Sequence, residues 1–80
     1  MTITIFSLID CPNCHRLMMM LDRAGISYEE MNIEKSNEAL AEAAFRGILN
    51  CQYPVVYIDD VKLDAMTPVE YFQKIKEAGN

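Results

Sequence analysis

Positive charge is scarce in this sequence. Its 80 residues include 7 Lys and Arg against 12 Asp and Glu, which gives a formal net charge of −5. The few basic residues form no cluster. An acidic surface repels the phosphates of nucleic acids and the headgroups of anionic lipids. We therefore expect no nucleic-acid partner and no membrane partner.

Long apolar runs are also missing. No segment approaches the roughly 20 apolar residues that a membrane-spanning helix needs. Met1–Phe6 has neither the basic residues nor the long apolar stretch of a secretion signal. We therefore expect a cytoplasmic protein, in a compartment that keeps thiols reduced.

Cysteine is too rare for a small secreted domain stapled by disulfides, which usually carries a larger and even number. There are three, and two of them, Cys11 and Cys14, lie close together. In the cytosol such a pair indicates redox chemistry or metal binding. No repeat or linker interrupts the chain, so we expect a single domain over residues 1–80, and a monomer.

Apolar periodicity, helix caps and turn residues divide the chain into seven elements in the order β-α-β-α-β-β-α. They are a strand Thr2–Ser7, a helix Cys11–Ala24, a strand Ser27–Ile33, a helix after Ser36 that ends near Gly47, strands Pro54–Ile58 and Val61–Leu63, and a helix capped by Thr67. The first β-α-β implies a parallel pair, and the closing hairpin adds an antiparallel pair. The fold class is therefore α/β, a four-stranded mixed sheet flanked by three helices.

Cys11-Pro12-Asn13-Cys14 follows the first strand and opens the first helix. Free N–H groups and the helix dipole stabilise negative charge there, so we expect a reactive thiolate at Cys11. Cys14, one turn further, is expected to be more buried and to act as the resolving thiol. Pro12 suits the first turn, and Asn13 lines the rim.

Charged neighbours of this motif allow two interpretations. His15 and Arg16 either supply positive potential to Cys11 or are solvated side chains of the first turn. Asp10 acts in the opposite direction, since a nearby carboxylate raises the pKa of a thiol. Glu29 and Glu30 are interpreted as a solvated strand edge.

Tyr53-Pro54 opens the third strand. The proline either marks the start of the strand without a further role or forms a cis peptide bond with Tyr53. A cis bond would turn the Tyr53 backbone toward Cys11, where its N–H and C=O could pair with a bound peptide or glutathione. Cys51, three residues earlier, is either a small buried apolar residue or a regulatory thiol.

Three segments together resemble the glutaredoxin family. They are Cys11-Pro12-Asn13-Cys14, Gly25-Ile26-Ser27-Tyr28-Glu29-Glu30 and Pro54-Val55-Val56-Tyr57-Ile58-Asp59. The resemblance implies a thioredoxin fold, a thiol–disulfide oxidoreductase, and a cis Pro54. It also implies partners: disulfide-containing proteins or glutathione as substrates, and a reductase as electron source.

The resemblance leaves the reductant open. Leu63–Thr67 lacks the G-G-x-[DE] sequence that receives the γ-glutamyl group of glutathione in the family, although Thr67 at a helix N-cap could help to hold a carboxylate. A related group of glutaredoxin-like electron donors is reduced by thioredoxin reductase instead. We expect no bound cofactor, with glutathione as a candidate reductant or substrate.

A metal-binding module is the competing class. Cys11, Cys14, His15 and Cys51 nominally form a Cys₃His zinc set. The resemblance to glutaredoxins also implies an iron–sulfur cluster bridged between two chains by one thiolate each plus glutathione, which the missing G-G-x-[DE] sequence argues against. His15, next to Cys14 on a helix, points in a different direction, and no second C-x-x-C exists. We therefore expect no metal site.

Overall fold

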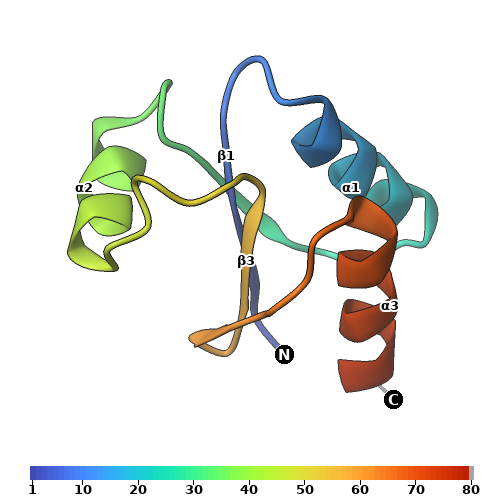
Figure 1. The fold of residues 1–80 in the computed structure, drawn as a ribbon. Helices are drawn as coiled ribbons and strands as arrows, with labels where there is room; N and C mark the ends of the chain where they lie inside the picture. The colour runs from blue at the N-terminus through green and yellow to red at the C-terminus, as the bar shows by residue number, and fades with distance from the viewer. Residues whose placement is uncertain (80) are drawn as a thin grey trace.

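The computed structural model describes residues 1–79 and contains the seven expected elements in the expected order (Figure 1). They are β1 (Ile3–Ser7), α1 (Pro12–Arg23), β2 (Glu29–Asn32), α2 (Asn37–Phe45), β3 (Val55–Ile58), β4 (Val61–Lys62) and α3 (Pro68–Ala78). Over these residues no helix is long and apolar enough to cross a membrane.

The four strands form one mixed sheet in the order β2-β1-β3-β4. β1 pairs with β2 in parallel and with β3 antiparallel, and β3 pairs with β4 antiparallel. Figure 1 shows α1 and α3 together on one side of the sheet and α2 on the other. This is the thioredoxin fold, so the predicted fold class is confirmed.

Residues of β1 alternate between two apolar clusters because successive strand side chains point to opposite faces. Ile3 and Ile5 pack against α1 and α3, whereas Phe6 faces α2. The first cluster also contains Leu17, Leu21, Val56, Tyr71 and Ile75, and the second contains Ala43, Ile48, Val55 and Tyr57. The sheet is therefore covered on both faces.

Glycines follow the first two helices, next to the ends that the sequence predicts. Gly25 and Gly47 have φ values of 71° and 73°, which a side chain would oppose. The Ile26 N–H then bonds to the Leu21 carbonyl oxygen at 3.0 Å, and the Ile48 N–H bonds to Ala43 in the same way. Each helix thus closes with an apolar residue turned back onto it.

The second and fourth strands are shorter than predicted. Pairing with β1 begins only at Glu29, opposite Thr4, because Ser27 and Tyr28 still carry the chain from the helix end to the sheet. β4 contains only Val61 and Lys62, both exposed. The positions of these strands are as expected, and their lengths are set by the partner strand rather than by their own composition.

Arg46 joins α2 to the sheet. Its guanidinium carbon lies 4.3 Å from the Tyr57 ring centroid, and its nitrogens donate to Glu42 at 2.8 Å and Asp60 at 3.2 Å. The hydrogen bond to Glu42 is the main reason that the pKa of Arg46 is raised. One cation thus connects the end of α2 to the β3–β4 turn.

Candidate functional site

Cys11 is the N-cap of α1, a position that serine, threonine, aspartate or asparagine usually occupies. Its backbone is extended, with φ −130° and ψ 92°, and its sulfur accepts the backbone N–H of Cys14 at 3.2 Å. Pro12 follows in the first turn, where its missing N–H costs no helical bond. A thiolate at Cys11 would accept the same N–H more strongly, because a charged acceptor strengthens a hydrogen bond.

Cys11 and Cys14 form a disulfide, with their Cα atoms 5.2 Å apart. That separation is ordinary for a bonded pair and also for two residues one turn apart on a helix. Cys11 retains 7% of its surface exposed, whereas Cys14 is fully buried. Solvent therefore reaches the pair from the Cys11 side, as the sequence predicts.

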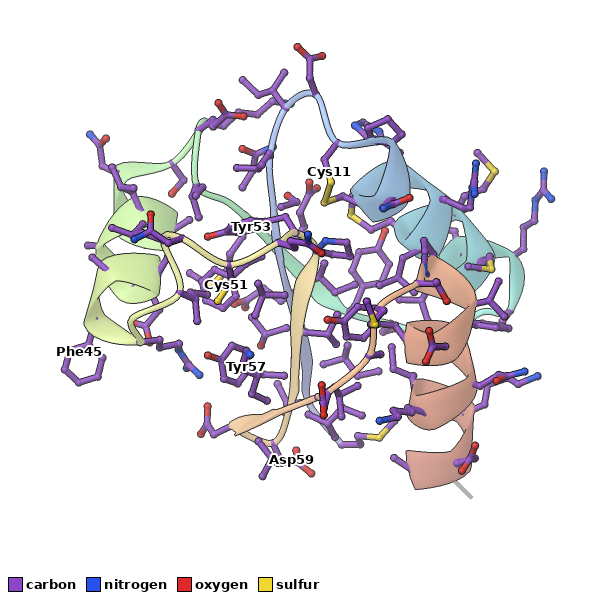
Figure 2. All side chains as sticks on the ribbon, viewed as in Figure 1. Cys11, Phe45, Cys51, Tyr53, Tyr57 and Asp59 are labelled. Atoms are coloured by element: carbon purple, nitrogen blue, oxygen red, sulfur yellow. A yellow bond between two sulfur atoms is a disulfide. The ribbon has the colours of Figure 1, made fainter. Side chains whose placement is uncertain are left out.

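Tyr53 lies at the same end of the molecule as Cys11, on the connection from α2 to β3 (Figure 2), and Pro54 is the residue after it. The peptide bond between them is cis, which confirms the interpretation of Pro54 as the site of a cis bond. The Tyr53 hydroxyl donates to the Ile48 carbonyl oxygen at 3.0 Å, and burial raises the pKa of Tyr53. This hydrogen bond ties the Tyr53 loop to the end of α2.

A hollow of about 340 Å³ beside the disulfide is lined by Ile9, Asp10, Cys11, Pro12 and His15. The His15 Nε2 atom lies 3.1 Å from the Ile9 carbonyl oxygen, so the ring is held against the preceding loop. The hollow therefore contains one carboxylate side chain and an apolar rim.

Asn13 and Arg16, like Pro12, have exposed side chains on the first turns of α1. Among the described residues, the side chains of Arg16 and Asn13 make no hydrogen bond within the protein. For Arg16 this matches the solvated alternative, and the lining role of Asn13 stays a prediction.

Thr67 caps α3, as predicted. Its hydroxyl oxygen accepts the Glu70 N–H at 3.2 Å, and the hydroxyl lies 3.2 Å from a Glu70 carboxylate oxygen, to which it donates. The carboxylate thus bonds the Thr67 side chain rather than its backbone N–H, the partner in a standard capping box. Negative charge already lies at this helix end, where a ligand carboxylate was expected.

Cys51 is a free, half-buried cysteine that packs on the cluster around Phe6, Ala43 and Tyr57. This packing matches the interpretation as a small apolar residue, and a regulatory role stays a hypothesis. In residues 1–79 no group of three His, Cys, Asp or Glu side chains is arranged to hold a metal ion.

Sequence reasoning missed a polar pair at the end of β1. Ser7, the last residue of β1, is fully buried, and its hydroxyl donates to a Glu30 carboxylate oxygen at 2.8 Å. Glu30 is exposed, but its carboxylate turns inward, so it is not simply part of a solvated strand edge. The available signal was a serine that alternates in phase with the apolar Ile3 and Ile5 of the same strand.

A family model described as Glutaredoxin matches residues 3–63. The chain belongs to the glutaredoxin family. A probable glutaredoxin, ssr2061 of Synechocystis, is 34% identical over 58 residues, which cover 72% of this glutaredoxin and 66% of the relative. The match thus spans just under two thirds of the relative's length.

Solved structures agree with this assignment. NrdH-redoxin from Escherichia coli, a glutaredoxin-like protein, superposes with a TM-score of 0.70 and 28% identity over 94% of this glutaredoxin and 95% of that chain. The thioredoxin-like protein BC3987 superposes with a TM-score of 0.74 and 23% identity, over 92% of this chain and 99% of that chain. The second likeness supports the fold alone.

Proposed function

We propose that this glutaredoxin reduces disulfides by dithiol exchange. The Cys11 thiolate attacks one sulfur of a substrate disulfide, so that a Cys11–substrate bond forms and the first substrate thiolate leaves. Cys14 then attacks Cys11, the second substrate thiolate leaves, and both cysteines end oxidised. Pro12 and Asn13 on one side, and Tyr53 and Pro54 on the other, form the groove. No bound cofactor takes part.

The observation that carries the proposal is the place of Cys11 at the N-cap of α1. Its sulfur already accepts the Cys14 N–H, and its backbone is at the positive end of the helix dipole. Cys14 is within bonding distance but fully buried, so a substrate meets Cys11 first. This asymmetry supports separate attacking and resolving roles.

Two substitutions test the assignment, both in a Cys51→Ser background that leaves only the C-x-x-C thiols. Cys11→Ser should abolish disulfide reduction, whereas Cys14→Ser should accumulate a mixed disulfide with the substrate that mass spectrometry detects. Cys51→Ser alone serves as the control and should retain full activity. Reduction by the Cys11→Ser protein would refute the assignment.

For the electron source, we propose a protein reductase of the thioredoxin reductase type rather than glutathione. Glutathione carries two carboxylates, and the hollow beside Cys11 holds the side chain of Asp10. The N-terminus of α3 already interacts with the Glu70 carboxylate through Thr67. NrdH-redoxin, whose structure is described as the basis for a thioredoxin-like activity profile, covers nearly all of this chain.

A coupled assay separates the two electron sources. The oxidised protein is offered NADPH with thioredoxin reductase, or NADPH with glutathione and glutathione reductase, and recovery of the Cys11–Cys14 dithiol is measured. We expect rapid reduction by the first system and slow reduction by the second. Faster recovery with glutathione would contradict the proposed electron source and leave the dithiol mechanism intact.

A further inference from the structure

Ile9 lies in the turn between β1 and α1, two residues before Cys11, and its side chain is 46% exposed. It is one of the residues that line the hollow beside the disulfide. Single exposed apolar residues are common on protein surfaces and by themselves indicate no function. Ile9 differs from them because side chains hold its backbone in place.

Both polar groups of the Ile9 backbone are hydrogen-bonded to side chains. The N–H donates to the Glu34 carboxylate at 2.7 Å. The carbonyl oxygen lies 3.1 Å from His15 Nε2, and because a carbonyl oxygen only accepts, the imidazole donates through that nitrogen. The bond to the carboxylate belongs to the stronger, charge-assisted class. Two segments far apart in the chain thus hold one turn residue.

The segment that carries Glu34 is itself attached to the sheet. The Ile33 N–H bonds to the Ser7 carbonyl oxygen at 3.1 Å, directly after the last residue pair of β1 and β2. The Glu34 N–H bonds to the Asn32 side chain at 3.0 Å. The carboxylate that holds Ile9 therefore has a fixed position relative to β1.

A fixed backbone makes the Ile9 side chain a better binding surface. Isoleucine is β-branched, so its χ1 angle is restricted as well. A ligand that packs on such a side chain causes little further loss of conformational freedom, and this preorganisation favours binding. Ile9 thus presents apolar surface, already ordered, beside the sulfur that a substrate meets first.

The lining of the hollow favours an apolar group on the substrate. Ile9 and Pro12 contribute apolar surface, whereas Asp10 contributes a carboxylate that repels a negatively charged group. Glutathione has two carboxylates and no large apolar side chain. A cysteine within a polypeptide, with apolar residues next to it, matches the lining without the unfavourable charge.

We propose that Ile9 is a specificity-determining residue that packs on an apolar side chain beside the cysteine of a protein substrate, and that Glu34 and His15 position it; this rests on the dithiol mechanism proposed above. The contact is present while Cys11 attacks the substrate sulfur. It therefore raises the second-order rate for disulfides of this kind and leaves the chemistry at the two sulfurs unchanged.

The attack by Cys11 is measured alone in a Cys51→Ser, Cys14→Ser background, in which the mixed disulfide persists. Two blocked peptides carry their cysteine in a disulfide with a coloured aromatic thiol, and they have either leucine or asparagine on both sides of that cysteine. The aromatic thiol is the better leaving group, so Cys11 bonds to the peptide sulfur. The readout is the ratio of the two rates, which a general change in folding or in thiol reactivity leaves unchanged.

We expect this parent protein to prefer the leucine peptide about three- to tenfold, and Ile9→Thr to remove most of the preference. Ile9→Leu should keep it. The matched control is Val61→Thr, which changes another exposed β-branched residue. Val61 follows the β3–β4 turn, whose Asp59 lies at the opposite end of the molecule from Cys11 (Figure 2), so this variant should retain the ratio of the parent.

The positioning role is tested in the same assay. Glu34→Ala and His15→Ala should both lower the ratio, whereas Glu34→Gln should keep it because its amide oxygen accepts the Ile9 N–H. A ratio in Ile9→Thr equal to that of the parent would overturn the proposal. A ratio that neither alanine variant lowers would overturn the positioning role. Failure of the parent to release the coloured thiol from either peptide would instead refute the dithiol mechanism.

Discussion

Two neighbouring groups have opposite effects on the ionisation of Cys11. The start of α1 and the Cys14 N–H favour a negative sulfur, whereas the carboxylate of Asp10, the preceding residue, disfavours it. The helix contribution acts through a direct hydrogen bond at 3.2 Å, and Asp10 is exposed and screened by water. We infer that the helix contribution is the larger one.

Asp10→Asn should therefore increase the reactivity of Cys11. Removing an exposed carboxylate at contact range is equivalent to at most about 1 kcal/mol, so the rate of alkylation measured below the pKa of Cys11, where the thiolate fraction limits the rate, should rise roughly two- to fivefold. The increase should shrink as salt is added. Glu77→Gln, the same charge change at the far end of α3, is the control. A slower Asp10→Asn protein would contradict the inference.

Some residues of the site could be recognised from sequence and others could not. Cys11, Cys14 and the cis Pro54 belong to local patterns with a direct physical meaning. The Ser7–Glu30 hydrogen bond joins residues 23 positions apart. Its formation depends on the register of β1 against β2, which no local pattern specifies.

Helix ends were the best predicted features at the scale of elements. Cys11, Ser36 and Thr67 each accept an N–H three residues further on, and Gly25 and Gly47 end their helices. These signals are short-range, so the sequence contains all of their parts. The strand lengths were predicted less well because hydrogen bonding to β1 determines them.

Thr67 provides a test at the scale of an element. Thr67→Ala removes the hydroxyl that caps α3 and should lower the free energy of unfolding by about 1 kcal/mol, whereas Thr67→Ser should lose little. Urea denaturation of the oxidised proteins measures both. A loss of disulfide reduction in Thr67→Ala with unchanged stability would instead support the predicted role of Thr67 in substrate binding.

At the scale of the molecule, the sheet separates two apolar clusters. The side covered by α1 and α3 contains Tyr71, which is only 7% exposed. Its pKa is raised, chiefly by burial, so the folded protein holds the phenol proton more tightly than the unfolded chain does. Stability is therefore greatest below the unfolded value of about 10 and falls as the pH rises through the folded value.

Tyr71→Phe should consequently reduce the alkaline loss of stability. The expected result is a smaller fall in the free energy of unfolding as the pH is raised above about 10, because the variant has one fewer proton to lose. Urea denaturation across this range, with the oxidised wild type as reference, makes the measurement. An equally steep fall in the variant would show that Tyr71 is not a source of the alkaline sensitivity.

The most direct test of the mechanism is the ionisation of Cys11 in the reduced protein. The ultraviolet absorbance of the thiolate is measured against pH in the Cys51→Ser protein. The same titration of the double variant Cys51→Ser/Cys11→Ser lacks the Cys11 transition, and the difference between the two curves assigns it. If the start of α1 ionises this sulfur as we infer, the pKa lies between about 3.5 and 7.5. A value at or above about 8.5, that of an unstructured cysteine, would contradict the inference.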